Sequence, residues 1–206
     1  GGPEVSYDAE KFLTENSEFK GVMVGEGEET FKELAGYYVE KNPQDLKDMT
    51  GICYRDGDQI IHNGWRQIMD LSSIPFIYKD LSEFKNRIIY YESSRGCPFS
   101  CSYCLSSIDK KLRFRDTETV KKELQFFIDN KVPQVKFVDR TFNCKHDHAM
   151  AIWKYIQEHD NGITNFHFEV AADLLNDEEI RLIRQMRPGL IQLEIGVQST
   201  NPQTIK

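Results

Sequence analysis

From residue 86 onward, short apolar stretches alternate with longer segments in which apolar residues recur every three or four positions. The short stretches predict strands at 88–93, 134–139, 166–170 and 190–196. The longer segments between them have the periodicity of amphipathic helices. Strands that alternate with helices favour an α/β fold in which the strands form a parallel sheet or barrel.

Residues at the ends of these segments carry helix start and stop signals. Thr117 is expected to cap the first helix, and Asn176 the third, where Glu179 completes a capping-box-like pattern. The dipeptide 188–189, Pro-Gly, should end the third helix before the last strand begins.

The N-terminal part of the chain has its own pattern. An apolar run at 22–24, a glycine-bearing turn and an amphipathic helix at about 29–41 together predict an α/β unit of the kind found in doubly wound sheets. Asn42 and Pro43 should end that helix. Residues 51–62 predict a β-hairpin, with Asp56-Gly57 as its turn dipeptide, and Cys53 on one arm is expected to be a small buried side chain.

Polar residues occupy alternate positions on the third and fourth strands. His167 and Glu169 alternate with apolar residues on one strand, and Gln192 and Glu194 do so on the next. A period of two places each polar set on one face, which would be the interior of a barrel. A barrel interior lined by polar groups predicts a binding cavity near the carboxyl ends of the strands.

The composition of the chain indicates which partners and which cellular location to expect. The 206 residues include 26 Lys and Arg against 33 Asp and Glu, for a net charge of −7. We therefore expect no nucleic-acid partner and no attraction to an anionic membrane. No apolar run is long enough to span a membrane, and clustered thiols without a secretory signal favour a reducing cytoplasm.

Three cysteines gather directly after the first strand of the sheet. Cys97, Cys101 and Cys104 have the spacing C-x3-C-x2-C, and three thiolates this close can bind one soft metal centre. A structural zinc site and a simple electron-transfer cluster are closed by four protein ligands. Three ligands on a 4Fe-4S cluster leave one iron open to a substrate or cofactor.

Other interpretations of the same residues remain open. A zinc knuckle could take its fourth ligand from His146 or His148, and Cys144 lies beside them. For residues 144–148 the favoured interpretation is that they are solvated polar residues capping the helix that they begin. A non-catalytic module, either an iron-sulfur electron carrier or a zinc-stabilised domain, is the alternative function. Arg113 and Arg115 are interpreted by default as residues of a solvated loop. The alternatives are that they neutralise a carboxylate or steer an acidic partner.

The cysteine spacing, with an aromatic residue just before the third cysteine, resembles the signature of radical S-adenosylmethionine (SAM) enzymes. The resemblance implies that the three cysteines hold a 4Fe-4S cluster and that Tyr103 lies against the adenine of SAM. It also implies reductive cleavage of SAM to a 5'-deoxyadenosyl radical, which abstracts hydrogen from a substrate. Domains of this family are usually partial six-stranded (β/α) barrels, so about four of six strands are expected here.

The same resemblance suggests further cofactor contacts. In the family a segment after the second strand, often Gly-Gly-Glu, contacts the methionine amine; here residues 138–141 read Val-Asp-Arg-Thr, and Asp139 is the expected substitute. Glu169 stands at the end of the third strand, where a polar contact to the cofactor is common. Gln198 and Ser199 follow the fourth strand, near the expected cofactor site. For Asp139, Glu169 and Gln198 the alternative is structural pairing with Arg140 or a neighbouring lysine.

The N-terminal part resembles the final third of the cobalamin-binding, Rossmann-like domain that precedes many radical SAM domains. The resemblance rests on residues 1–6 and 24–31, whereas the D-x-H-x-x-G motif that supplies an axial histidine to cobalt does not occur in this sequence. Cobalamin is thus implied for a longer parent protein. The expected divisions are a remnant of that domain at 1–45, a hairpin and linker at 46–85, and the first part of the barrel at 86–206.

The function expected from this resemblance is radical hydrogen abstraction, with methyl transfer through cobalamin as an extension. The implied partners are a small-molecule or peptide substrate and an electron donor such as flavodoxin or ferredoxin. We expect a chain truncated at both ends and inactive alone.

Overall fold

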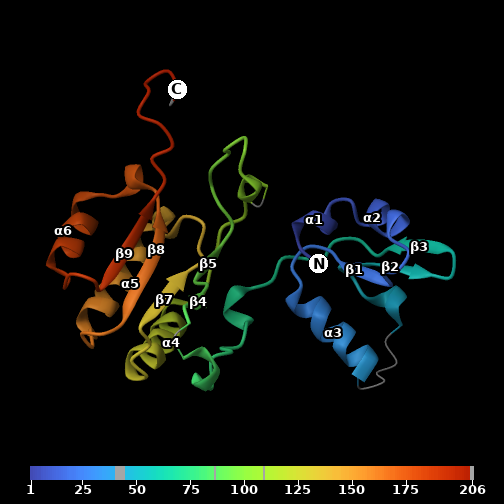
Figure 1. The fold of residues 1–206 in the computed structure, drawn as a ribbon, viewed down its shortest axis with the longest axis horizontal. Helices are drawn as coiled ribbons and strands as arrows, with labels where there is room; N and C mark the ends of the chain where they lie inside the picture. The colour runs from blue at the N-terminus through green and yellow to red at the C-terminus, as the bar shows by residue number, and fades with distance from the viewer. Residues whose placement is uncertain (40–44, 86, 109, 205–206) are drawn as a thin grey trace. The chain divides into compact units, whose positions relative to one another are not determined.

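The computed structural model describes residues 1–39, 45–85, 87–108 and 110–204. The chain divides into two compact units, Gly1–Met69 and Asp70–Lys206 (Figure 1). No helix within the described ranges is long and apolar enough to cross a membrane.

The second unit is built on a four-stranded parallel sheet. Its strands, in spatial order, are β4 (Ile89–Tyr91), β7 (Gln134–Phe137), β8 (Asn165–Val170) and β9 (Ile191–Ile195). All four predicted strands are therefore confirmed, and they neighbour one another in the order of the sequence. This arrangement is the predicted part of a (β/α) barrel.

Helices α4 (Thr117–Asp129), α5 (His146–Glu158) and α6 (Asp177–Gln185) cover one face of this sheet (Figure 1). Alternate strand residues point into the core that they share with the helices, and the largest fully buried side chains include Phe137, Phe166, Phe168 and Trp153. The intervening strand positions are polar and lie on the opposite face. The period-two pattern of the sequence thus separates a packed face from a polar face.

The helix caps were predicted with mixed success. Asn176 accepts hydrogen bonds from the backbone of α6, and Glu179 bonds back to the Asn176 N–H, so the predicted capping box is confirmed. The prediction that Thr117 caps α4 was wrong. Asp116 is the cap: its Oδ2 accepts from the Thr119 N–H at 2.8 Å, and Thr117 is the first helical residue.

Short elements connect the regular ones. Five 3-10 turns lie in the second unit: Leu71–Ser73, Ser82–Phe84, Leu105–Ser107, Phe142–Cys144 and Ala172–Leu174. A two-stranded antiparallel ribbon, β5 (Ser94–Arg95) with β6 (Arg113–Phe114), brackets the cysteine-bearing segment. The segment predicted as a plain linker, 63–85, therefore contains two helical turns.

The first unit holds α1 (Pro3–Ser6), α2 (Ala9–Glu15), β1 (Gly21–Met23), α3 (Glu28–Val39), a 3-10 turn (Leu46–Asp48), β2 (Ile52–Asp56) and β3 (Gln59–His62). The predicted strand and helix are present, but β1 pairs antiparallel with β2. The strand thus extends the hairpin, whereas a doubly wound sheet would have paired it in parallel. The predicted helix end at Asn42 and Pro43 lies outside the described residues.

The hairpin of β2 and β3 is confirmed, with a shifted turn. Asp56 pairs with Gln59, so the two turn residues are Gly57 and Asp58, one position later than predicted. Gly57 supplies the positive φ of 57° that this turn needs. Cys53 is fully buried, as expected. The hairpin belongs to the same compact unit as residues 1–39, and the predicted domain divisions stay predictions.

Candidate metal centre

The cysteine-bearing segment leaves the sheet at the carboxyl end of β4. The chain passes from Tyr91 into β5, and Ser94 pairs with Phe114 of the returning strand β6. Gly96 then turns the chain with a φ of 96°, a backbone conformation that favours glycine. The cysteines therefore lie on a loop at the end of the sheet where function gathers in such folds.

The three predicted metal ligands are cysteines outside any disulfide, and they differ in exposure. Cys97 is buried, Cys104 is half-buried and Cys101 is exposed. The Cys104 N–H donates to the Cys101 carbonyl at 3.1 Å, which forms a tight turn between these two ligands. In the described residues, no three His, Cys, Asp or Glu side chains are gathered as they would be around a single metal ion.

The donor set fits a 4Fe-4S cluster. None of the three cysteines forms a disulfide, all three belong to one loop, and thiolate is the ligand that iron-sulfur clusters require. The irons of a cubane occupy separate corners, so the cysteine sulfurs need not meet at one point.

The remaining predicted cofactor contacts lie at the carboxyl ends of strands or on the loop itself. Tyr103 is 76% exposed on the cysteine loop. Gln198, with a φ of 57°, and Ser199 follow β9, and the Ser199 Oγ accepts from the Asn201 N–H at 3.0 Å. Across the described part of the chain, no hydrogen bond or ion pair joins Tyr103 to Gln198 or Ser199.

Asp139 is buried completely just beyond β7. Its Oδ1 accepts from the Ser93 N–H at 2.8 Å, and its Oδ2 accepts from the hydroxyls of Ser93 and Ser94 at 2.5 and 2.7 Å. Burial raises the pKa of Asp139 to about 6, although the serine hydrogen bonds oppose the rise. The carboxylate thus binds the chain that leads to the cysteines; whether it also contacts a cofactor amine stays a prediction.

Both histidines of the zinc alternative have polar partners other than the cysteines. His148 is buried with its Nε2 3.1 Å from the Ser93 Oγ, and burial, followed by the charge of Lys145, lowers its pKa to about 4. His146 lies 3.1 Å from Glu179, which raises its pKa, and it also bonds to Asn176. These partners give both histidines structural positions at the start of α5, so the closed zinc site is not favoured.

Cys144 lies in the 3-10 turn before α5 and is half-buried. Its N–H donates to the Thr141 carbonyl at 3.1 Å, and burial, followed by the charge of Asp139, raises the pKa of its thiol. A raised pKa disfavours the thiolate form that binds metals. The same turn brings the Thr141 Oγ1 to 3.9 Å from the Sγ of Cys97.

The polar face of the sheet carries an ion-pair cluster that spans three strands. Lys136 of β7 donates to Glu194 of β9 at 3.1 Å and lies 3.6 Å from Glu169 of β8. The Nε2 of His167 lies 3.1 Å from Glu194 without the alignment of a hydrogen bond. The predicted polar face is therefore confirmed, and Lys136 is its cation. Hydrogen bonding to Lys136 lowers the pKa of Glu194.

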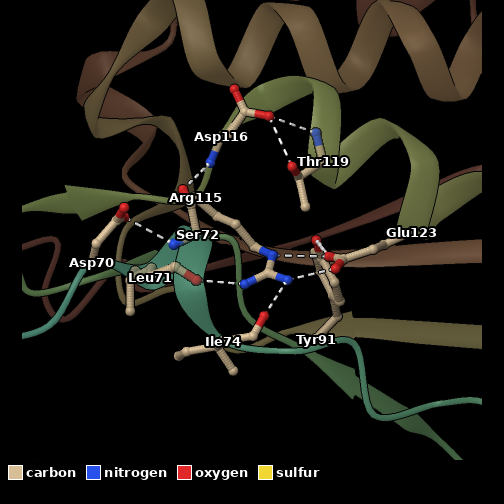
Figure 2. Close-up of polar contacts among 9 residues, drawn as sticks. All are labelled: Asp70, Leu71, Ser72, Ile74, Tyr91, Arg115, Asp116, Thr119 and Glu123. Atoms are coloured by element: carbon tan, nitrogen blue, oxygen red, sulfur yellow. Dashed lines mark hydrogen bonds and ion pairs between the residues drawn. The ribbon is translucent and has the colours of Figure 1, made fainter.

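A second buried network lies beneath the β5–β6 ribbon. Arg115 forms a bidentate ion pair with Glu123 of α4, and Tyr91 of β4 donates to the same carboxylate at 2.6 Å (Figure 2). Arg115 also donates to the carbonyls of Leu71 and Ile74. Burial, followed by the hydrogen bond to Glu123, raises the pKa of Tyr91.

The default prediction that Arg115 belongs to a solvated loop was wrong, since its side chain is 7% exposed, and the alternative that it neutralises a carboxylate is confirmed. A signal was present in the sequence: Glu123 lies on the helix face formed by Val120, Leu124 and Phe127. A carboxylate on an apolar helix face needs a cation or hydrogen-bond donors beside it. Arg115 supplies both.

Residues 91–206, more than half of the chain, match the Radical SAM superfamily. The chain belongs to this superfamily. Its members use a 4Fe-4S cluster and SAM, and the predicted recognition and fold class are confirmed at this level.

Curated relatives match across the chain. An uncharacterized methyltransferase of Pyrococcus horikoshii is 27% identical over the whole chain, which covers 46% of that protein. The anaerobic magnesium-protoporphyrin IX monomethyl ester cyclase of Synechocystis is 26% identical, again over the whole chain and 42% of the relative. The chain therefore spans about half the length of these relatives.

Solved structures share the fold. The radical SAM methyltransferase TsrM from Kitasatospora setae, solved with cobalamin and a 4Fe-4S cluster bound, superposes with a TM-score of 0.72 over 97% of this chain and 41% of TsrM. The identity of 14% makes this a likeness of fold.

Proposed function

We propose that Cys97, Cys101 and Cys104 hold a 4Fe-4S cluster whose open iron binds SAM, in a longer protein that carries out radical chemistry. When bound, the cluster supplies the electron that cleaves SAM to a 5'-deoxyadenosyl radical. The observation that carries the proposal is a loop with three cysteines that form no disulfide, placed at the carboxyl end of a parallel sheet in a chain of this superfamily.

The chain's own residues would bind and orient SAM. Tyr103 is exposed beside the third cysteine and is available to stack on the adenine ring. Glu169 stands at the end of β8 on the polar face, and Gln198 and Ser199 follow β9, so these three side chains offer polar contacts at the same end of the sheet. Asp139 already accepts three hydrogen bonds from Ser93 and Ser94.

Methyl transfer through cobalamin is the extension of this proposal for the longer protein. TokK of Streptomyces tokunonensis, named a cobalamin-dependent radical SAM methyltransferase, is 25% identical over 69% of this chain. The Pyrococcus and Synechocystis relatives match the first unit as well as the second. We propose that the first unit contributes to a cobalamin-binding domain, and that the protein acts in the cytoplasm on a small molecule or peptide with a flavodoxin or ferredoxin as electron donor.

Anaerobic reconstitution of this chain tests the proposal. We expect about four irons and four sulfides per chain, and an EPR signal after dithionite reduction that changes shape when SAM is added. Stoichiometric zinc, or a cluster whose spectrum ignores SAM, would contradict it and favour a closed metal module. Titration of hydroxocobalamin into the same preparation, followed by its visible absorption, tests the cobalamin extension separately.

A further inference from the structure

One buried carboxylate joins two segments that are far apart in the sequence. Asp139, just after β7, accepts three hydrogen bonds from Ser93 and Ser94, which lie between β4 and the cysteine loop. Asp139 is 0% exposed, Ser93 is 0% and Ser94 is 3%. Every one of these bonds is therefore shielded from water, where the loss of an acceptor is costly.

The direction of the hydrogen bonds is fixed by the donors available. The Ser93 hydroxyl has one proton, and an ionised Asp139 can only accept, so this proton points to the carboxylate. The Nε2 of His148, 3.1 Å from the same hydroxyl, must then donate to it. When His148 is neutral and protonated at Nε2, every hydrogen bond in this network has one defined donor and one defined acceptor.

A second contact lies two residues further along. The hydroxyl of Thr141 is 3.9 Å from the Sγ of Cys97. The same hydroxyl donates to the backbone carbonyl of Arg140. The segment from Asp139 to Thr141 thus touches the strand before the loop and the first cysteine of the loop. Cys97 is 8% exposed, whereas Cys101 is exposed.

We propose that Asp139 is a positioning residue: its buried carboxylate fixes Ser93 and Ser94 and thereby holds Cys97 in place before any cluster binds. This proposal rests on the proposed function only in that the loop is taken to bind a cluster. It replaces the expected contact between Asp139 and the cofactor amine.

Replacing Asp139 by asparagine distinguishes a positioning role from a contact to the cofactor amine. In Asp139→Asn the Oδ1 can still accept from the Ser93 N–H, and the amide NH2 can donate to both serine hydroxyls that Oδ2 accepted from. Hydroxyl groups donate or accept with equal ease, and His148 can carry its proton on Nδ1 so that its Nε2 accepts from Ser93; the geometry therefore survives without the charge. A contact to a cationic amine would need that charge and would be lost.

The first readout is alkylation of the metal-free chain by iodoacetamide, with the rate at each cysteine followed by mass spectrometry. Asp139→Ala removes three buried hydrogen bonds, so the rate at Cys97 should rise about tenfold or more. The rate at the exposed Cys101 should stay the same. Asp139→Asn should keep Cys97 as protected as in the unaltered chain.

Asp160→Ala is the matched control for lost stability. Asp160 forms a bidentate ion pair with Arg187, and both residues precede strands, at the end of the sheet opposite the cysteine loop. This variant should lose stability without exposing Cys97. If Asp139→Ala does not fold, Ser94→Ala removes a single bond of the network and should raise the rate at Cys97 about threefold.

The second readout is the cluster itself. After reconstitution Asp139→Asn should match the unaltered chain in iron content, EPR line shape and response to SAM, while Asp139→Ala should bind less iron and give a broadened signal. An unchanged rate at Cys97 in a folded Asp139→Ala overturns the proposal, and so does an Asp139→Asn that exposes Cys97. Because alkylation needs no cluster, these results stand even if the chain fails to bind iron.

Discussion

Arg115 and Glu123 form a buried bidentate ion pair, with the Nε of Arg115 2.9 Å from one carboxylate oxygen and its Nη2 2.5 Å from the other. Neither side chain is more than 8% exposed. Since Arg115 also donates to the carbonyls of Leu71 and Ile74, the pair fastens the segment before β4 to α4 (Figure 2). The network holds the base of the ribbon from which the cysteine loop extends.

Glu123→Gln should lower the free energy of unfolding by roughly 3 kcal/mol, because it leaves the buried Arg115 without its counter-charge. Urea denaturation followed by circular dichroism measures the change. Glu118→Gln is the control on the same helix: Glu118 pairs with Lys121 and is 71% exposed, so its loss should cost about 0.5 kcal/mol or less. Equal losses in the two variants would show that the buried pair contributes no more than a surface pair.

The network of Asp139 and His148 predicts an unusual dependence of stability on pH. Burial raises the pKa of Asp139 from 3.8 to about 6, so its contribution to stability falls as the pH rises through this window. Burial lowers the pKa of His148 from 6.5 to about 4, so its contribution grows as the pH rises through nearly the same window. Each effect is worth roughly 3 kcal/mol, and the two oppose one another.

Removing one of these two groups should reveal the pH dependence of stability that the other contributes. In Asp139→Asn the free energy of unfolding should increase from pH 4 to pH 6.5 by roughly 3 kcal/mol more than in the unaltered chain, because only His148 still titrates. In His148→Gln it should decrease over the same range. Urea titrations at pH 4.5, 5.5 and 6.5 measure both slopes, and equal slopes in the two variants would contradict the assignment.

Local patterns in the sequence were sufficient to predict the second unit. The four strands were predictable because alternation of polar and apolar residues reports two faces, and Asn176 because a helix cap depends on residues within one turn. The antiparallel position of β1 was not predictable, since pairing depends on which strand lies beside it in space. The shifted turn at Gly57 has the same origin: the register of a hairpin is set by its two strands together.

The candidate site was predictable only in part. Cysteine spacing identifies the metal-binding loop because its three ligands are neighbours in sequence. The hydrogen bonds from Ser93 and Ser94 to Asp139 join residues about 45 positions apart, and serine has no periodic signature. The sequence therefore indicated Asp139 by its position at the end of a strand, but it did not indicate that Ser93 and Ser94 are its hydrogen-bond partners.

Substituting the cysteines distinguishes an open cluster from a closed one. Cys101→Ala should abolish cluster binding, because two thiolates cannot hold a cubane stably. Cys144→Ala should leave iron and sulfide content unchanged, since three ligands suffice when one iron is left for SAM. Cys53→Ala, in the buried core of the first unit, is the control for thiol loss in general. Loss of iron in Cys144→Ala would identify a fourth protein ligand and contradict the open site.

Glu169 offers the sharpest test of a contact to SAM on the sheet itself. Its side chain is 33% exposed on the polar face, 3.6 Å from Lys136, so it has a charge partner and also open space before it. Glu169→Gln keeps the size of the side chain and removes the charge. If Glu169 accepts a charge-assisted hydrogen bond from SAM, the variant should bind SAM about tenfold more weakly, while its iron content stays the same.

The comparison needs a glutamate that faces away from the sheet. Glu178 of α6 pairs with Lys154 of α5 on the outer surface, so Glu178→Gln should bind SAM as the unaltered chain does. Titration of SAM into the reduced, reconstituted chain, followed by the change in EPR line shape, gives all three dissociation constants. Equal constants in the two variants would mean that Glu169 serves only to hold Lys136 in the ion-pair cluster, and that polar groups after β9 contact SAM in its place.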